Sequence, residues 1–203
     1  VYLNNGRGQL TRKEDAFKDL YVTASCVRAF DFTGDGAVDL FIGGRSIPKA
    51  YGDNPTSYLL VNDGKGNFTD KTTQLAPELR TIGMVTNVEL VDLNKDQRLD
   101  LLLSIEWKSL TVFHQNNGRF EKAIPLGSNQ KGWWNFTLTH DFDQDGDLDI
   151  LAGNLGLNSR IKASEKEPVR LYVGDIDKND RVDQILTYYL NGEETLFANK
   201  MET

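Results

Sequence analysis

The sequence has little of what disulfide-bonded, zinc-binding and membrane-spanning proteins need. Its 203 residues include one cysteine, Cys26, and two histidines, His114 and His140. A single cysteine excludes an intrachain disulfide, and we expect Cys26 to be a small buried hydrophobic residue. The sequence contains no zinc-type His/Cys spacing, P-loop, dinucleotide fingerprint or Gly-x-Ser-x-Gly motif. No apolar run approaches the ~20 residues that span a bilayer, so no transmembrane segment is expected.

Basic residues are also in the minority. The chain has 23 Lys and Arg against 30 Asp and Glu, a formal net charge of −7. Phosphate binding requires a basic face, so nucleic acid is not an expected partner. Hydrophobic residues make up 39% of the chain, and its length allows one substantial core. Composition therefore indicates an ordinary folded protein whose acidic residues need a specific explanation.

That explanation is a repeated acidic loop of nine residues. The clearest copy covers residues 141–149, with aspartates at positions 1, 3, 5 and 9 and Gly146 at position 6. Side-chain oxygens at these positions, with the backbone carbonyl of position 7, suit Ca²⁺, which takes six to eight oxygen ligands. Glycine at position 6 permits a sharp turn. In chain order, the four copies are loop 1 (31–39), loop 2 (92–100), loop 3 (141–149) and loop 4 (175–183).

The loops predict up to four Ca²⁺ sites. The predicted ligands are Asp31, Thr33, Asp35, Ala37 and Asp39 in loop 1; Asp92, Asn94, Asp96, Arg98 and Asp100 in loop 2; Asp141, Asp143, Asp145, Asp147 and Asp149 in loop 3; and Asp175, Asp177, Asn179, Arg181 and Asp183 in loop 4. Thr33 is a weaker ligand than a carboxylate, and Gln97 and Asp180 replace the glycine, so lower occupancy is expected in loops 1, 2 and 4. A metal-free turn is the alternative for any single copy, because Asp and Asn favour tight turns.

These loops are not EF-hands. Position 12, where an EF-hand has a bidentate glutamate, is occupied by Ile42, Leu103, Ala152 and Leu186. The flanking segments are apolar and strand-like rather than helical. Each loop is therefore predicted to join the two strands of a β-hairpin, with the position-9 aspartate at the start of the returning strand.

A second motif alternates with the acidic loops. Residues 1–10 match residues 59–68, and residues 113–120 are a shortened copy. Each has an apolar strand, an Asn-Gly or Asp-Gly turn and a second strand, the strongest short-range hairpin signal in a sequence. An acidic-loop hairpin followed by a turn hairpin gives four strands, which is typical of a propeller blade. We therefore expect an all-β fold of four-stranded antiparallel β-propeller blades, an incomplete propeller segment of about three to four blades.

The expected organisation is a single propeller segment. Its approximate units are residues 1–20, 21–70, 71–122, 123–168 and 169–203, of which the first and last are partial blades. Propellers usually close with four to eight blades, so we expect a segment of a longer protein, or self-association through open blade edges. Residues 152–164 replace the turn hairpin of one unit, either as a degenerate blade or as an irregular loop packed against the disc.

The pairing of Asp-x-Asp-x-Asp-Gly-x-x-Asp loops with Asn-Asp-Gly-x-Gly-x-Phe hairpins resembles the FG-GAP/VCBS repeats of integrin α-subunit propellers and their bacterial relatives. Longer strings are similar to large exported bacterial VCBS-repeat proteins, which often carry ASPIC/UnbV-type modules; these strings are residues 43–48, 57–64, 132–135, 152–159 and 168–173. The resemblance covers essentially the whole chain. It implies a Ca²⁺-stapled propeller that is exported to a periplasmic, outer-membrane-associated or extracellular location.

Two long insertions, residues 44–57 and 127–134, are candidate partner-binding loops. Long loops on a rigid scaffold concentrate binding residues. Arg45, Trp133 and Trp134 are therefore candidates for contact with a protein or glycan partner. For Arg45 the alternative is a structural pair with an aspartate. For the tryptophan pair it is packing, because neighbours on a strand point to opposite faces.

The expected function is a non-catalytic, calcium-stapled exported scaffold for protein or glycan binding. The alternative is part of a calcium-dependent carbohydrate-active enzyme, such as a propeller polysaccharide lyase, in which His140 would be a candidate base. A lyase needs an exposed base and a cation at a cleft that faces the substrate. The position of the acidic loops relative to Arg45, His140 and Trp133 discriminates between the two functions.

Overall fold

The computed structural model describes residues 1–121, 124–127, 130–156, 159 and 161–197, and it is built almost entirely from antiparallel strands. The strands are β1 (Tyr2–Asn4), β2 (Leu10–Arg12), β3 (Thr23–Phe30), β4 (Asp39–Ser46), β5 (Tyr58–Asn62), β6 (Phe68–Asp70), β7 (Met84–Val91), β8 (Asp100–Lys108), β9 (Thr111–Phe113), β10 (Gln115–Asn116), β11 (Arg119–Phe120), β12 (Ile124–Pro125), β13 (Gly132–His140), β14 (Asp149–Asn154), β15 (Arg170–Gly174), β16 (Asp183–Leu190) and β17 (Glu193–Leu196). Two short helical segments, α1 (Thr72–Leu75) and the 3₁₀ helix η1 (Pro77–Thr81), lie between β6 and β7. Among the described residues, no helix is long and apolar enough to cross a membrane. The all-β prediction is confirmed.

The first blade is the four-stranded sheet β3-β4-β5-β6, with its strands in sequence order. Loop 1 joins β3 to β4, and the Asn-Asp-Gly turn joins β5 to β6. The second blade repeats this order with β7, β8, β9 and β12. Its third strand continues from β9 into β10, where the Glu121 N–H donates to the His114 carbonyl (2.8 Å). Both blades have the predicted alternation of an acidic-loop hairpin and a turn hairpin.

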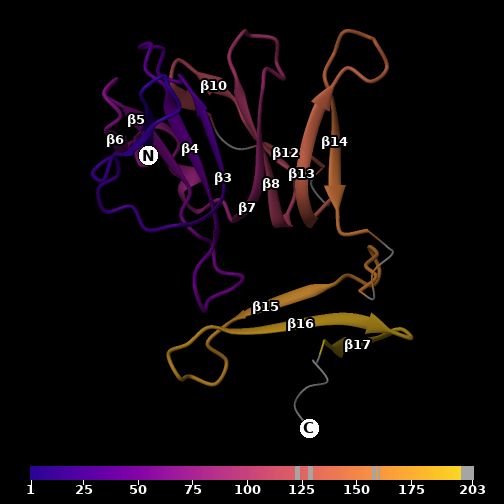
Figure 1. Ribbon diagram of the computed structural model, residues 1–203. Coiled ribbons are helices and arrows are strands. Elements are labelled where there is room, and N and C mark those ends of the chain that lie inside the picture. The colour runs from indigo at the N-terminus through magenta and orange to yellow at the C-terminus, as the bar shows by residue number, and fades with distance from the viewer. Residues whose placement is uncertain (122–123, 128–129, 157–158, 160, 198–203) are drawn as a thin grey trace.

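The third sheet is shorter. It consists of the hairpin β13–β14, which meets the second blade where Gly132 and Trp133 pair with Lys108 and Glu106. These three sheets stand in a row, with β14 at one end (Figure 1). The three-stranded sheet β15-β16-β17 lies below the row, crossing the strand ends that are opposite loops 1–3 (Figure 1). The predicted unit boundaries stay a prediction.

The core lies between the faces of neighbouring sheets. Successive side chains of β8 alternate between its two faces. Leu101 and Leu103 pack toward the first blade with Phe41, whereas Leu102 packs toward Ile150 of the third sheet. The row of sheets is therefore held together by apolar side chains on both faces of the second blade.

The first and second blades approach so closely that β4 requires glycine. A Cβ atom on Gly43 would lie 2.8 Å from a methyl carbon of Val85 in the second blade and 2.6 Å from the Cys26 Sγ in its own blade. At Gly44 the constraint comes from the first blade alone, because a Cβ atom there would lie 2.4 Å from the Thr56 carbonyl oxygen in the connection before β5. Cys26 is buried, as predicted. Burial is the main reason that the pKa of the Cys26 thiol is raised.

Leu103→Ala should destabilise the protein by about 2–5 kcal/mol, because it leaves a cavity where a fully buried side chain meets the first blade. The measurement is the free energy of unfolding in urea. Leu190→Ala is the matched control, since Leu190 is 52% exposed on β16. Equal effects of the two substitutions would contradict this account of the core.

Candidate metal centres and a neighbouring cavity

The four acidic loops share one backbone conformation. Each joins two antiparallel strands, and the position-9 aspartate is the first residue of the returning strand, as predicted. Positions 4 and 6 have a positive φ in every loop: Gly34, Gly36, Lys95, Gln97, Gln144, Gly146, Lys178 and Asp180. Gln97 (φ 67°) and Asp180 (φ 63°) thus adopt the left-handed conformation that Gly36 and Gly146 adopt elsewhere. The missing glycines do not change the path of loops 2 and 4.

A common hydrogen bond closes each loop. The position-6 amide donates to the position-1 carboxylate; the four bonds are Gly36 to Asp31 (2.8 Å), Gln97 to Asp92 (2.8 Å), Gly146 to Asp141 (2.9 Å) and Asp180 to Asp175 (3.0 Å). In loop 1, the amide of Gly36 is the main reason that the pKa of Asp31 is lowered. Each loop is therefore closed around a position-1 aspartate that accepts a bond from its own backbone.

The carboxylates of positions 1, 3 and 9 converge. In loop 3 these residues are Asp141, Asp143 and Asp149, and one oxygen of each lies within 4.8 Å of the others. The equivalent trio in loop 4 is Asp175, Asp177 and Asp183. Clustered oxygen donors are what Ca²⁺ requires. The residues present therefore fit the cation that was predicted from the sequence.

Loops 1 and 2 have a neutral residue at position 3. In loop 1 the Thr33 hydroxyl donates to Asp31 (3.4 Å) and to Asp39 (3.1 Å), so positions 1, 3 and 9 converge there too. In loop 2, Asn94 instead bonds to position 5, with its amide donating to the Asp96 carboxylate (2.9 Å). Loop 1 thus keeps the oxygen cluster with one fewer charge, and loop 2 has its Asn94 amide turned toward Asp96.

Position 5 is turned toward its own backbone. The Asp35, Asp96 and Asp145 carboxylates accept the N–H of position 7, at 2.8, 2.9 and 2.8 Å. Burial raises the pKa of Asp96, but its bonds from Arg98 and Asn94 outweigh this, and the net shift is downward. Position 5 was predicted as a ligand on equal terms with positions 1, 3 and 9. In loop 3 the converging carboxylates are those of Asp141, Asp143 and Asp149, without Asp145.

In loop 1 the position-9 aspartate also has a structural role that the sequence prediction missed. Asp39 is completely buried. One carboxylate oxygen accepts the N–H of Thr33 (3.3 Å), and the other accepts the N–H of Asn62 in the third strand (2.9 Å). The Asn62 amide in turn donates to the Val38 carbonyl (2.9 Å). One side chain therefore fastens the loop hairpin to the turn hairpin.

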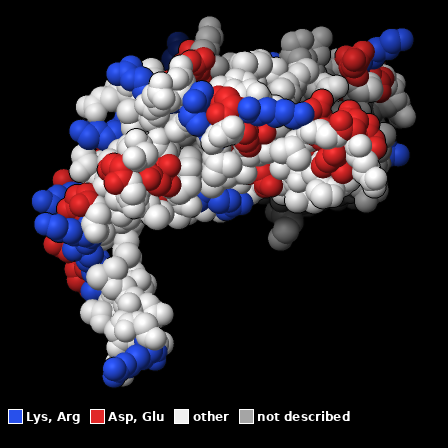
Figure 2. Space-filling view, turned by 90° about the horizontal axis from the view of Figure 1, so that it is seen from above, with Lys and Arg blue, Asp and Glu red and all other residues white. Residues whose placement is uncertain are grey.

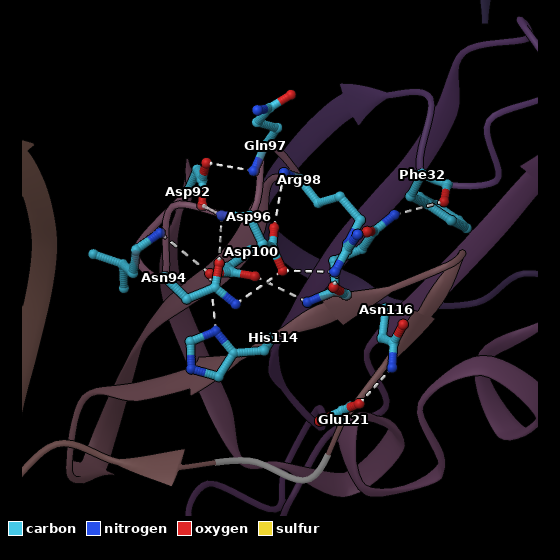
Figure 3. A network of polar contacts seen from close by, with 12 residues as sticks. Phe32, Asp92, Asn94, Asp96, Gln97, Arg98, Asp100, His114, Asn116 and Glu121 are labelled. Carbon is cyan, nitrogen blue, oxygen red and sulfur yellow. Dashed lines mark hydrogen bonds and ion pairs between the residues drawn. The ribbon is translucent and has the colours of Figure 1, made fainter.

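Loop 2 repeats this arrangement (Figure 3). Asp100 is completely buried; one oxygen accepts the N–H of Leu93 (3.2 Å) and contacts the His114 ring (2.9 Å). The other oxygen accepts the N–H of Gln115 in the third strand (2.9 Å). The Gln115 side chain then donates to the Phe32 carbonyl of loop 1 (2.9 Å), linking the second blade to the first. In loop 3, by contrast, Asp149 is exposed.

Loops 2 and 3 are linked by an ion pair between Lys95 and Asp147. The bond to Asp147 is the main reason that the pKa of Lys95 is raised, and Asp145 and Asp141 add to it. Acidic side chains form several separate groups on this face, with basic side chains between them (Figure 2). The acidic side chains of the loops therefore form separate clusters of negative charge, with basic side chains near them.

A cavity of about 780 Å³ opens at the other end of the strands, and Trp107, Trp133, Asn154, Lys131 and Glu165 are among its lining residues. The Trp107 and Trp133 rings meet edge to face, with centroids 4.9 Å apart. Trp134 was predicted together with Trp133, but it is not among the described residues that line the cavity. The structure adds Trp107 in its place.

Trp107 is held by a partly buried chain of polar contacts. Its indole N–H donates to the Tyr51 oxygen (3.0 Å), and the Tyr51 hydroxyl donates to Glu106 (2.7 Å). Glu106 also pairs with Arg45, which therefore has the structural pairing considered for it, with a glutamate in place of an aspartate. Burial and the Glu106 bond raise the pKa of Tyr51 to about 12, so it stays a neutral donor. Trp107 has φ 67°, a strained value for a bulky residue.

Comparison with known families gives one match, to the FG-GAP-like repeat, over residues 31–103 and 92–152. Each match begins at position 1 of an acidic loop, and together they span more than half of the chain. The chain belongs to the FG-GAP-like repeat family. No curated protein matches it. The predicted FG-GAP resemblance is confirmed, whereas the resemblance to exported bacterial proteins stays a prediction.

The strands of the FG-GAP-like repeats place the acidic loops and the cavity at opposite ends. Loop 2 ends where β8 begins, and Trp107 lies seven residues further along that strand, roughly 23 Å at the usual rise per residue. Trp133 is likewise at the start of β13, while His140 ends it beside loop 3. The cavity and the acidic loops are therefore at opposite ends of the same strands.

Asp100→Ala should lower the free energy of unfolding by about 3–5 kcal/mol, because it leaves the buried Gln115 N–H, the partly buried Leu93 N–H and His114 without their acceptor. Asp149→Ala, at the same position of loop 3, should cost about 1 kcal/mol or less, since its bond is to the exposed N–H of Phe142. Urea unfolding in excess chelator measures both without any metal contribution. Similar losses would refute the structural role assigned to Asp100.

Proposed function

We propose that this FG-GAP-like repeat protein is an exported, non-catalytic scaffold that Ca²⁺ staples and that binds a saccharide at the Trp107–Trp133 cavity. The observation that carries the calcium assignment is the convergence of three carboxylates in loop 3 and again in loop 4. Like charges at this spacing repel, and a divalent cation removes the repulsion. The ion would act structurally, by holding the start of one strand against the end of the preceding strand.

Asp141, Asp143 and Asp149 would hold Ca²⁺ in loop 3, and Asp175, Asp177 and Asp183 in loop 4. In loops 1 and 2 the buried position-9 aspartates already have backbone partners, so these loops depend less on a cation. Exposed sites such as loop 3 fit the range of about 10⁻⁴–10⁻³ M at which extracellular modules bind Ca²⁺. Such affinities are useful where Ca²⁺ is millimolar, which supports an exported location.

Calcium should raise the melting temperature of chelator-treated protein, because it binds the folded loops in preference to the unfolded chain. Asp143→Asn should weaken binding at loop 3 by about tenfold or more, since ligand charge tunes affinity in oxygen cages. Asp147→Asn makes the same change of charge in the same loop at a position expected to use its backbone carbonyl, so it should leave affinity nearly unchanged. Titration calorimetry measures both variants. A melting temperature unaffected by calcium would sink the proposal.

The saccharide assignment rests on the chemistry of the cavity. Aromatic faces pack against the apolar faces of sugar rings, and the nearby Asn154, Lys131 and Glu165 side chains offer donors and acceptors for hydroxyl groups. The bond from Trp107 to Tyr51 fixes one ring in place before any ligand arrives. A fixed aromatic anchor loses little conformational freedom on binding.

Trp133→Ala should reduce saccharide affinity by about tenfold or more, because truncating an aromatic anchor commonly removes most of its binding energy. Trp134→Ala is the neighbouring control and should leave affinity within about twofold. A glycan array followed by calorimetry on its hits makes the measurement. Equal losses in both variants, or no hits, would argue for a protein partner.

The carbohydrate-active alternative is less well supported. A calcium-dependent lyase needs its base and cation at one cleft, whereas His140 and loop 3 lie at the opposite end of β13 from the cavity. We therefore propose no catalytic residue. A rise in unsaturated-product absorbance on incubation with acidic polysaccharides would overturn this part of the proposal.

A further inference from the structure

Loop 2 uses its carboxylate oxygens differently from loops 3 and 4. Asp92 accepts the N–H groups of Asp96 (3.0 Å) and Gln97 (2.8 Å), one on each oxygen. Asp100 likewise accepts a backbone N–H on each of its oxygens. Asp96 accepts the position-7 N–H on one oxygen and two side-chain donors on the other. Every carboxylate oxygen of loop 2 therefore already has a donor from the chain.

Loops 3 and 4 keep carboxylate oxygens without such donors. Asp143 and Asp149 of loop 3 each accept a backbone N–H on one oxygen, and no described residue donates to the other. In loop 4, Asp177 and Asp183 also have one oxygen each to which none of the described residues donates. These oxygens belong to the converging trios of aspartates. Loops 3 and 4 thus present unpaired acceptors to a cation, and loop 2 does not.

The donor that sets loop 2 apart is the half-buried guanidinium of Arg98 (Figure 3). One of its terminal nitrogens donates to Asp96 (2.8 Å), and its Nε donates to the Gln115 carbonyl of the third strand (3.1 Å). The Asn94 amide donates to the same Asp96 oxygen (2.9 Å). Because its two partners lie on different parts of the blade, the guanidinium is fixed in place.

Loop 4 has an arginine at the same position, but this arginine is not engaged. Arg181 is exposed, and its side chain makes no ion pair or hydrogen bond with any residue that the structure describes. Position 5 of loop 4 is Asn179, whose amide donates to Asp177 at position 3 (2.8 Å). The carboxylate of loop 4 is therefore inside the converging trio, and position 5 offers the arginine no carboxylate to bind.

We propose that the Arg98 guanidinium takes the place of Ca²⁺ in loop 2, so that this loop keeps its shape without a metal ion. The inference rests on the calcium assignment of the proposed function for loops 3 and 4, and it excludes loop 2 from that assignment. A guanidinium is permanently charged, and its planar array of donors matches a carboxylate. A Ca²⁺ ion brought to loop 2 would be repelled by this fixed charge.

The position of the second blade gives this difference a consequence. The blade stands between the first blade and the third sheet (Figure 1). Removal of calcium should loosen loops 3 and 4 while loop 2 stays closed. In the cavity, Trp107 comes from the second blade and Trp133 from the third sheet. Calcium would therefore act on one wall of the cavity and not on the other.

Hydrogen exchange in excess chelator, measured by NMR, tests the guanidinium without any metal present. In Arg98→Gln protein the amides of residues 96–98 should exchange about fivefold faster or more, because a charge-assisted contact at a partly exposed site is lost. Arg181→Gln is the matched control, since it makes the same change at position 7 of loop 4. It should leave the exchange of residues 179–181 within about twofold of the wild type.

A calcium titration followed by NMR tests the exclusion of the metal from loop 2. In the wild type, calcium should shift the amide signals of loops 3 and 4 and leave those of residues 96–98 in place. Asn94→Asp/Arg98→Gln protein has the position-3 carboxylate and lacks the guanidinium, so its loop 2 signals should shift with calcium as well. Asn94→Asp protein, which keeps the guanidinium, should bind calcium at loop 2 about tenfold more weakly than the double variant.

The two measurements separate this inference from the proposed function. Calcium-dependent shifts of residues 96–98 in the wild type would overturn the inference and leave the calcium assignment of loops 3 and 4 intact. So would equal affinities of loop 2 in the single and double variants, or unchanged exchange in Arg98→Gln protein. Absence of shifts in loops 3 and 4 would instead overturn the calcium assignment, and the exchange in chelator would still decide the role of Arg98.

Discussion

The structure depends on a buried carboxylate whose two oxygens serve different strands. At position 9 of loops 1 and 2, one oxygen accepts a bond from the loop and the other accepts an N–H from the third strand. A charged acceptor in a dry site makes strong bonds and is costly to leave unpaired. Asp39 and Asp100 therefore set the angle and register at which the turn hairpin joins the loop hairpin. The apolar faces of the resulting sheets can then stack.

Most of this architecture could be read from the sequence. The spacing of aspartates located all four loops, and the apolar flanks placed each on a hairpin. The Asn-Gly and Asp-Gly turns located the outer strands, because such turns demand a particular backbone twist. From the sequence, the position-9 aspartates were predicted only as metal ligands. Their role as buried hydrogen-bond acceptors was missed because an aspartate with this second role and one without it occur in the same sequence pattern.

Other features were beyond the sequence because they depend on tertiary contacts. Nothing in the local pattern links Arg45 to Glu106 or Trp107 to Tyr51, which are separated by more than fifty residues and meet only when the first two blades pack. The position of β15–β17 across the row depends on contacts such as that between Gly52 and Val173. Trp133 was identified as a binding candidate, but its aromatic partner came from a different strand.

The two ends of the strands differ in charge and in the kind of side chains they carry. The acidic loops lie at one end, and a cavity lined by both aromatic and polar side chains lies at the other. A saccharide in that cavity would be separated from the acidic loops by roughly three Debye lengths at physiological ionic strength, so their charges would be largely screened. Stability and recognition can thus respond to different changes in the solution.

The left-handed residues at positions 4 and 6 have a consequence for how such repeats diverge. Position 6 is glycine in loops 1 and 3 but Gln97 and Asp180 in loops 2 and 4, with the backbone path retained. A non-glycine residue there costs about 1 kcal/mol, a loss that one additional hydrogen bond can offset. Substitution at position 6 therefore changes the stability of the fold little, whereas substitution at the buried position 9 lowers it. A search pattern that demands the glycine would find two of the four repeats, and one built on the first and ninth aspartates would find them all.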